Sequence, residues 1–204
     1  VTEEVLGVDL VVEQIRVASG HKLSWTQADL KQHGHAIEVR VYAEDAAAGF
    51  LPAAGTAHLI VPPKGPGIRF DSGLESGDEV TVYYDPIVAK LVVSGSNREA
   101  AINRCRAALD ETAILGLTTN IDFLKAVLDQ NKFIEGDTHI EFLSEEMPEW
   151  SPEPLSGEDL SLALGLASMP KAAKEVQGNG KIGIPEPWVT LGHWEICGGQ
   201  HVED

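Results

Sequence analysis

The sequence has little cysteine and little positive charge, and both shortages exclude classes of protein. Cys105 and Cys197 are the only cysteines among 204 residues, and their separation suggests neither a metal pair nor a disulfide scaffold. Lysine and arginine number 15 against 32 acidic residues, a formal net charge of −17. A protein that binds nucleic acid must place cations against phosphates, so we expect no nucleic acid partner. The cysteine usage fits a reducing compartment and predicts a cytoplasmic protein.

Long apolar runs are also absent. No stretch approaches the roughly 20 apolar residues of a membrane-spanning helix, and the longest candidate, residues 87–93, contains Lys90. The opening residues Val1-Thr2-Glu3-Glu4 have neither the basic region nor the apolar region of a signal peptide. We therefore expect no membrane partner, and the missing initial Met indicates a piece of a longer polypeptide.

Several patterns that carry chemistry are missing as well. The sequence holds no glycine-rich phosphate loop and no Ser/His/Asp set. His33 and His35 alternate around a glycine, but two histidines without a third ligand are more typical of a surface or strand end than of a metal site. The acidic residues between Asp71 and Glu79 lack the oxygen-ligand spacing of a calcium loop. We expect no metal site in this chain.

What is present is enough for a folded core, since 43% of the residues are hydrophobic and 23% are charged. Apolar residues from Val8 to Ile15 recur at the spacing of one helix face, and Gly20 follows where a helix can end. The chain is therefore expected to open with a helix, and a second, shorter helix is expected over residues 26–31.

The period then changes to that of a strand. Apolar residues alternate with charged ones over residues 37–41, which predicts a half-buried strand with Glu38 and Arg40 on one face. Further strands are predicted at residues 56–61, 68–71, 79–84 and 87–94. The short segments between them, punctuated by glycine and proline, favour an antiparallel sheet.

Two helices complete the predicted domain. The apolar spacing predicts helices over residues 97–112 and 120–129, each with an asparagine, Asn97 or Asn120, as its N-cap candidate. The fold class is therefore α+β, a mainly antiparallel sheet with flanking helices, and the core domain ends near Leu143.

Beyond that point the composition shifts. Residues 133–170 contain no lysine or arginine, and three prolines within residues 147–157 indicate a linker. Residues 160–166 predict a short apolar helix, residues 177–187 are rich in glycine and proline, and residues 188–196 are amphipathic.

Two segments carry charge inside apolar strands. Residues 34–45 read GHAIEVRVYAED and place Glu38 and Arg40 on one strand face, and residues 83–91 read YYDPIVAKL and contain Asp85 and Lys90. From spacing alone, a surface salt bridge of little energetic value is the favoured interpretation of Arg40. A lysine within a Val/Leu-rich strand must reach water or find a carboxylate.

These two segments resemble the hallmark motifs of the biotin carboxylase C-terminal domain, found in acetyl-, propionyl- and methylcrotonyl-CoA carboxylases. Three further stretches agree with that family in order and spacing, so that the resemblance covers about residues 1–145. They are Val1-Thr2-Glu3, Gly49-Phe50-Leu51-Pro52 with Gly55, and Gly116-Leu117-Thr118-Thr119-Asn120.

The resemblance implies an enzyme that activates bicarbonate with ATP and transfers the carboxyl group to a ring nitrogen of biotin, which is tethered to a carrier domain. The family's ATP and Mg²⁺ or Mn²⁺ sites, its bicarbonate site and its catalytic acid/base lie upstream of Val1. The resemblance therefore implies that this chain alone is inactive and holds no cofactor.

Arg40 matches the family position whose guanidinium lies at the biotin ureido oxygen, which implies a catalytic and substrate-binding role. Asp85 matches an acid near that arginine and is expected to orient it, with capping of the turn before Pro86 as the alternative. Glu38 and Lys90 are expected to be structural ion-pair partners.

The resemblance also implies partners: the ATP-grasp half, the biotin carboxyl carrier and the carboxyltransferase. A homodimer is a further partner, because Arg69 resembles part of a dimerisation loop; Pro66 stands there where dimeric bacterial subunits carry an aromatic residue. The carrier's Met-Lys-Met pattern is absent, so biotin is expected beyond residue 204 or on another chain.

Three segments follow from this comparison. Residues 1–31 are expected to be the end of the ATP-grasp domain, residues 32–146 the biotin carboxylase C-terminal domain, and residues 147–204 a linker with the start of a carboxylase-interaction region. The equivalent piece of a pyruvate or urea carboxylase stays open, as do a non-catalytic module on the same scaffold and another ATP-grasp ligase, against which the EVR and YDP motifs argue.

Overall fold

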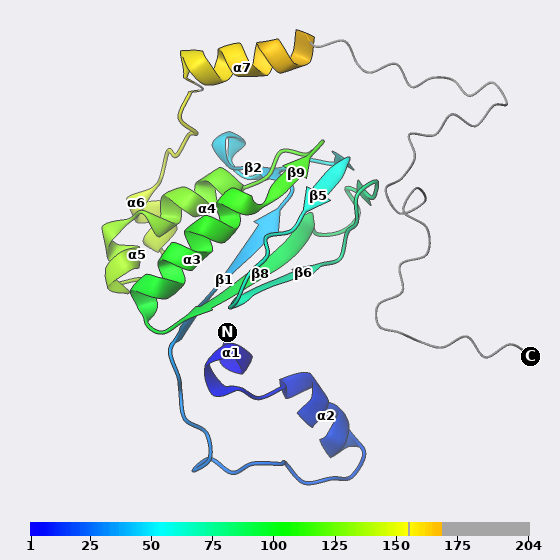
Figure 1. Ribbon diagram of the computed structural model, residues 1–204, viewed down its shortest axis with the longest axis vertical. Helices are drawn as coiled ribbons and strands as arrows, with labels where there is room; N and C mark the ends of the chain where they lie inside the picture. The colour runs from blue at the N-terminus through cyan, green and yellow to red at the C-terminus, as the bar shows by residue number, and fades with distance from the viewer. Residues whose placement is uncertain (155, 169–204) are drawn as a thin grey trace, which may run out of the picture. The chain divides into compact units, whose positions relative to one another are not determined.

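A computed structural model describes residues 1–154 and 156–168 (Figure 1). Its contacts divide the chain into two units, Val1–Glu153 and Pro154–Asp204. The first unit holds the mixed helix and sheet fold that the sequence predicts. The predicted features at residues 177–187 and 188–196 lie outside the described residues.

The centre of the first unit is a three-stranded antiparallel sheet with the order β1-β8-β6. The strands are β1 (His35–Tyr42), β8 (Ile87–Gly95) and β6 (Ile68–Ser72). Gly34 leads into β1 with φ +64°, and a Cβ there would collide with the Gly95 carbonyl oxygen, so the position requires glycine. The register of β1 and β8 shifts between Val41 and Tyr42, which marks a bulge.

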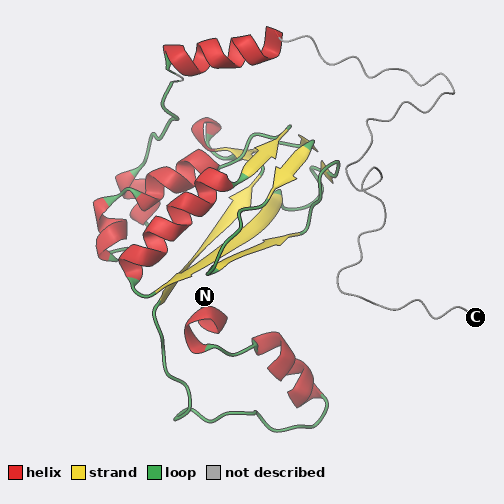
Figure 2. Ribbon diagram, viewed as in Figure 1, coloured by secondary structure: helices red, strands yellow, loops and turns green. Residues whose placement is uncertain are grey.

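Helices gather on one side of this sheet (Figure 2). They are α3 (Arg98–Glu111), α4 (Ile121–Leu128), α5 (Asn131–Glu135) and α6 (Phe142–Glu146). Asn97 caps α3 as predicted, since its side chain accepts a hydrogen bond from the Ala100 amide at 2.8 Å. Leu109 of α3 and Leu91 and Val93 of β8 are fully buried in the shared core.

Three two-stranded ladders surround the sheet, and they correct two predicted strands. The ladders are β2 (Glu44–Asp45) with β3 (Leu51–Pro52), β4 (Gly55–Thr56) with β7 (Glu79–Val80), and β5 (Leu59–Val61) with β9 (Ala113–Leu115); the short helix η1 (Ala46–Ala48) follows β2. The strand predicted over 56–61 is two strands, because its ends pair with different partners. The strand predicted over 79–84 ends at Val80, and the residues after it are exposed.

The N-terminal residues form two helices, α1 (Thr2–Leu6) and α2 (Leu10–Ala18). Asp9 caps α2 by accepting from the Val12 amide at 2.9 Å, and Gly20 ends it with φ +86°. The helix predicted over 26–31 is wrong. The Asp29 carboxylate there accepts from the amide and the hydroxyl of Thr26, which closes a turn in place of a helix.

The second unit contains α7 (Gly157–Ser168), which includes the predicted helix at 160–166. Within the residues that the structure describes, no helix is long and apolar enough to cross a membrane.

Candidate functional site

The face of the sheet that carries Arg40 also bears a row of charge. Arg40 of β1 lies opposite Lys90 of β8, and Lys90 lies opposite Asp71 of β6. Side chains alternate between the two faces of a strand, so the buried Val41 and Leu91 point away from this row. Three strands therefore place a cation, a second cation and an anion side by side.

Arg40 is the most exposed member of this row. Its Nε lies 3.5 Å from Oε1 of Glu38, two residues earlier on β1, and 61% of its side chain is exposed. Interaction with the Tyr42 side chain, and then with Glu38, raises the pKa of Arg40 above its ordinary value. The guanidinium is therefore a permanently charged donor held from its own strand, with most of its surface open to a ligand.

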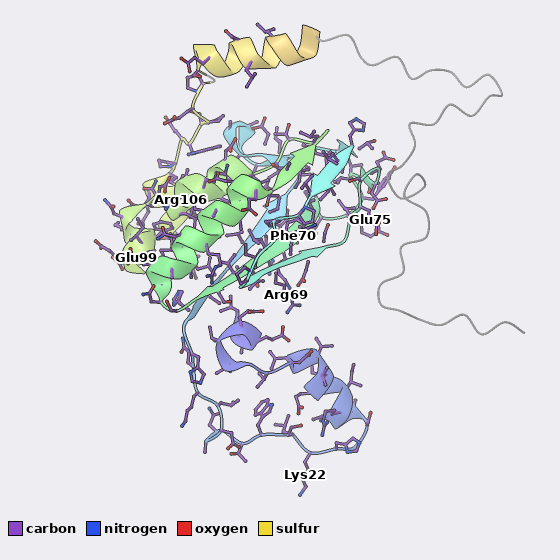
Figure 3. The ribbon with its side chains drawn as sticks, viewed as in Figure 1. Lys22, Arg69, Phe70, Glu75, Glu99 and Arg106 are labelled. Atoms are coloured by element: carbon purple, nitrogen blue, oxygen red, sulfur yellow. The ribbon has the colours of Figure 1, made fainter. Side chains whose placement is uncertain are left out.

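The other charges form a chain of ion pairs. Lys90 Nζ lies 3.6 Å from Asp71 Oδ2, Arg69 Nε lies 3.0 Å from Asp71 Oδ1, and Arg69 also reaches Glu3 of α1 at 2.9 Å. Figure 3 labels Arg69 on β6. The hydrogen bond from Arg69, partly offset by burial, lowers the pKa of Asp71. The prediction that Glu38 and Lys90 are ion-pair partners is confirmed.

A cavity lies at this row of charge. Its volume is about 440 Å³, and its lining includes Arg40, Lys90, Asp71 and Gly73 together with the first residues of β8. That volume falls within the roughly 300–1,000 Å³ of small-molecule sites. Because Asp71 occupies Lys90 and Arg69, Arg40 is the cation at this cavity that remains most available to a bound group.

Asp85 lies apart from the contacts of Arg40. It is exposed in the turn before β8, after Tyr83 and Tyr84, which are each 85% exposed. Among the residues that the structure describes, its carboxylate makes no hydrogen bond or ion pair. Glu38 is the acid that holds Arg40 here, and the orienting role of Asp85 stays a prediction.

The structure also brings Asn120 to the strand that carries Arg40. Asn120 is 5% exposed, and its side chain does not cap α4, so that part of the prediction is wrong. Its Oδ1 accepts from the Tyr42 amide at 3.0 Å instead, and its Nδ2 donates to the Arg40 carbonyl and to Glu44 at 3.2 Å each. Burial raises the pKa of the Glu44 carboxyl. The asparagine in the GLTTN motif was the available signal, but its spacing before a helix favoured a cap.

Metal ligands are not gathered at this site. No group of three or more His, Cys, Asp or Glu side chains that could hold a metal ion occurs within residues 1–154 and 156–168. The side chains at the cavity are suited to electrostatic binding of a group that carries or develops negative charge.

The chain belongs to the biotin carboxylase C-terminal domain family. The model of that family matches residues 38–145, which is more than half of the chain and includes Arg40, Asp85 and Asn120. The resemblance drawn from the two motifs is therefore confirmed.

Individual relatives are carboxylases of several kinds. The mitochondrial propionyl-CoA carboxylase alpha chain of Sus scrofa is 38% identical, over 100% of this chain and 29% of its own length. Biotin carboxylase of a Nostoc species is 45% identical, over 71% of this chain and 32% of its own. A pyruvate carboxylase subunit of Methanothermobacter thermautotrophicus is 46% identical, over 71% and 30%.

Solved structures confirm the fold. The biotin carboxylase domain dimer of Hydrogenobacter thermophilus 2-oxoglutarate carboxylase, in complex with MgADP, ADP and bicarbonate, matches with a TM-score of 0.72 and 37% identity, over 76% of this chain and 34% of that one. The biotin carboxylase subunit of a pyruvate carboxylase matches with a TM-score of 0.72 and 36% identity, over 74% and 34%. The chain thus spans about a third or less of these relatives.

Proposed function

We propose that this chain is the C-terminal part of the biotin carboxylase component of a biotin-dependent acyl-CoA carboxylase. In this proposal it completes the biotin site and is inactive alone. The observation that carries the proposal is the open Arg40 guanidinium, held by Glu38 at the cavity of a domain whose family is that of biotin carboxylases.

Arg40 performs the chemistry that this chain contributes. Biotin, when bound, supplies the ring nitrogen that accepts the carboxyl group and the ureido oxygen beside it. The guanidinium of Arg40 donates hydrogen bonds to that oxygen. A fixed cationic donor aimed where negative charge develops stabilises the transition state more than the ground state. Glu38 holds the guanidinium in place, and Asp85 approaches it from the turn before β8 when the site is assembled.

The remaining parts of the reaction belong to partners. ATP with Mg²⁺ or Mn²⁺, and bicarbonate, bind to the ATP-grasp half upstream of residue 1, and biotin arrives on a carboxyl carrier that also visits a carboxyltransferase. A homodimer is a further proposed partner, supported by the dimer of the Hydrogenobacter thermophilus relative. The cytoplasmic location is proposed from cysteine usage, and the buried, unpaired Cys105 fits a reducing compartment.

The choice of an acyl-CoA carboxylase rests on the extent of the matches. The propionyl-CoA carboxylase alpha chain of Sus scrofa and the methylcrotonoyl-CoA carboxylase alpha chain of Dictyostelium discoideum match 100% and 96% of this chain. The biotin carboxylase and pyruvate carboxylase relatives named above match 71%. Similarity that extends through the C-terminal part of the chain supports an acyl-CoA carboxylase, and the 46% identity to a pyruvate carboxylase relative supports the equivalent domain of a pyruvate carboxylase as the alternative.

Reconstitution tests the proposal. The full-length protein is assayed for carboxylation of free biotin with ATP and bicarbonate, and the 204-residue chain is assayed in parallel at the same concentration. We expect carboxybiotin from the full-length protein and none above background from the chain. Carboxybiotin formed by the chain alone would contradict the proposal, as would a full-length protein that forms none.

A further inference from the structure

Asn120 pairs with the open edge of β1. The sheet order β1-β8-β6 leaves one side of β1 without a strand. There the Asn120 amide donates to the Tyr42 carbonyl at 3.2 Å, and the Asn120 Oδ1 accepts from the Tyr42 amide at 3.0 Å. Two residues that exchange both hydrogen bonds form the pair seen in an antiparallel ladder. A single asparagine thus replaces a neighbouring strand.

The same side chain also holds the backbone of Arg40. The Asn120 Nδ2 donates to the Arg40 carbonyl at 3.2 Å and to Oε1 of Glu44 at 3.2 Å. The amide has two N–H donors and meets two acceptors, so its side chain is fully satisfied. Its orientation follows from its partners, because the Tyr42 amide is a donor and the two other groups are acceptors.

These bonds lie where β1 is least constrained by β8. The register shifts between Val41 and Tyr42, directly after Arg40, because β8 contributes an extra residue there. A bulge leaves part of a ladder unpaired and re-aims nearby side chains. Asn120 is bonded on both sides of that irregularity, at Arg40 and at Tyr42, and is itself 5% exposed.

We propose that Asn120 is a positioning residue for Arg40: by pairing with β1 from the first residue before α4, it fixes the direction in which the guanidinium enters the cavity. This inference rests on the proposed function. Asn120 touches no reacting group, and its effect passes through the backbone of residues 40–42. A misplacement of about 1 Å at a catalytic group can cost about a hundredfold in rate.

The test compares two asparagines that each bond to backbone. Asn120→Ala removes the bonds to β1, whereas Asn97→Ala removes the cap of α3 and leaves β1 untouched. Both variants are made in the full-length protein, and the readout is carboxylation of free biotin divided by bicarbonate-dependent ATP hydrolysis without biotin. We expect this ratio to fall about tenfold in Asn120→Ala, a partial misplacement of Arg40, and to stay at the wild-type value in Asn97→Ala.

A double-mutant cycle separates positioning from general damage. If Asn120 acts through Arg40, then Asn120→Ala changes the ratio by less than about twofold when Arg40→Ala is already present. A further tenfold fall on that background, an unchanged ratio in Asn120→Ala, or an equal fall in Asn97→Ala would overturn the inference. If Asn120→Ala does not fold, Asn120→Asp takes its place, because it keeps the acceptor for Tyr42 and loses the donors to Arg40 and Glu44.

The cycle also distinguishes the inference from the function on which it rests. If Arg40→Ala itself leaves the ratio unchanged, the proposed role of Arg40 fails. If Arg40→Ala lowers the ratio while Asn120→Ala behaves like Asn97→Ala, only the positioning role fails.

Discussion

At the scale of single residues, burial decides which side chains react. Cys105 lies on α3 with no exposed surface, and burial raises the pKa of its thiol to about 12. The thiolate is the reactive form, so at pH 8 we expect alkylation of Cys105 in the folded chain to be about a thousandfold slower than that of an ordinary exposed thiol. Mass spectrometry of the peptide that contains Cys105 measures the rate.

Unfolding provides the control for this prediction. In concentrated urea the same peptide is expected to react at the rate of a free cysteine. Rapid labelling of Cys105 in the native chain would contradict the packing of α3 against β8.

The sequence predicts residue roles well where partners are close along the chain. The alternation of β1 places Glu38 beside Arg40, two residues apart, and that pair forms. Asn120 is different, because Tyr42 is 78 positions away. A local pattern cannot register a contact made only when β1 and α4 meet, and the same residue before a helix is typical of a cap.

At the scale of elements, ion pairs join α1 to β6. Asp71 accepts from Arg69, which also binds Glu3, and the pKa of the Asp71 carboxyl is held below its ordinary value in the folded state. A depressed acid stabilises the fold above its unfolded pKa, and this contribution is lost as pH falls through the lower folded pKa. We therefore expect Asp71→Asn to lower the free energy of unfolding at pH 7 and to differ little from wild type below about pH 3.

Urea unfolding at the two pH values measures this difference. These side chains are exposed and screened, so the loss at pH 7 is expected to be no more than about 1 kcal/mol. Asp122→Asn is the matched control, since Asp122 is 74% exposed and only 3.9 Å from Lys125. A loss that persists undiminished below about pH 3 would show that Asp71 does not act through its charge.

Elements with a strong internal period were predictable, and elements fixed by distant pairing were not. The helix over 97–112 and the strand over 87–94 carry their patterns in their own residues, and both form. The predicted strand over 56–61 divides, because β4 pairs with β7 and β5 pairs with β9. The helix predicted over 26–31 gives way to a turn closed by Asp29, a local hydrogen bond that competes with helix formation.

At the scale of the whole molecule, the family was predictable while the geometry of the site was not. Ordered motifs over residues 1–145 indicated the biotin carboxylase C-terminal domain, and the family match bears this out. The sheet order and the row formed by Arg40, Lys90 and Asp71 depend on three strands that meet only in the fold. No one-dimensional pattern contains that register.

The central claim is that Arg40 serves the carboxylation of biotin, and one comparison tests it most directly. Carboxylation of free biotin and biotin-independent ATP hydrolysis are measured in the full-length protein carrying Arg40→Ala or Arg106→Ala. Arg106 is the matched control, an arginine of α3 that pairs with Asp129 on the helical side of the domain (Figure 3). We predict a loss of about a hundredfold or more in carboxylation for Arg40→Ala alone, with ATP hydrolysis retained. Unchanged carboxylation in Arg40→Ala would contradict the account and leave Arg40 a structural ion-pair residue.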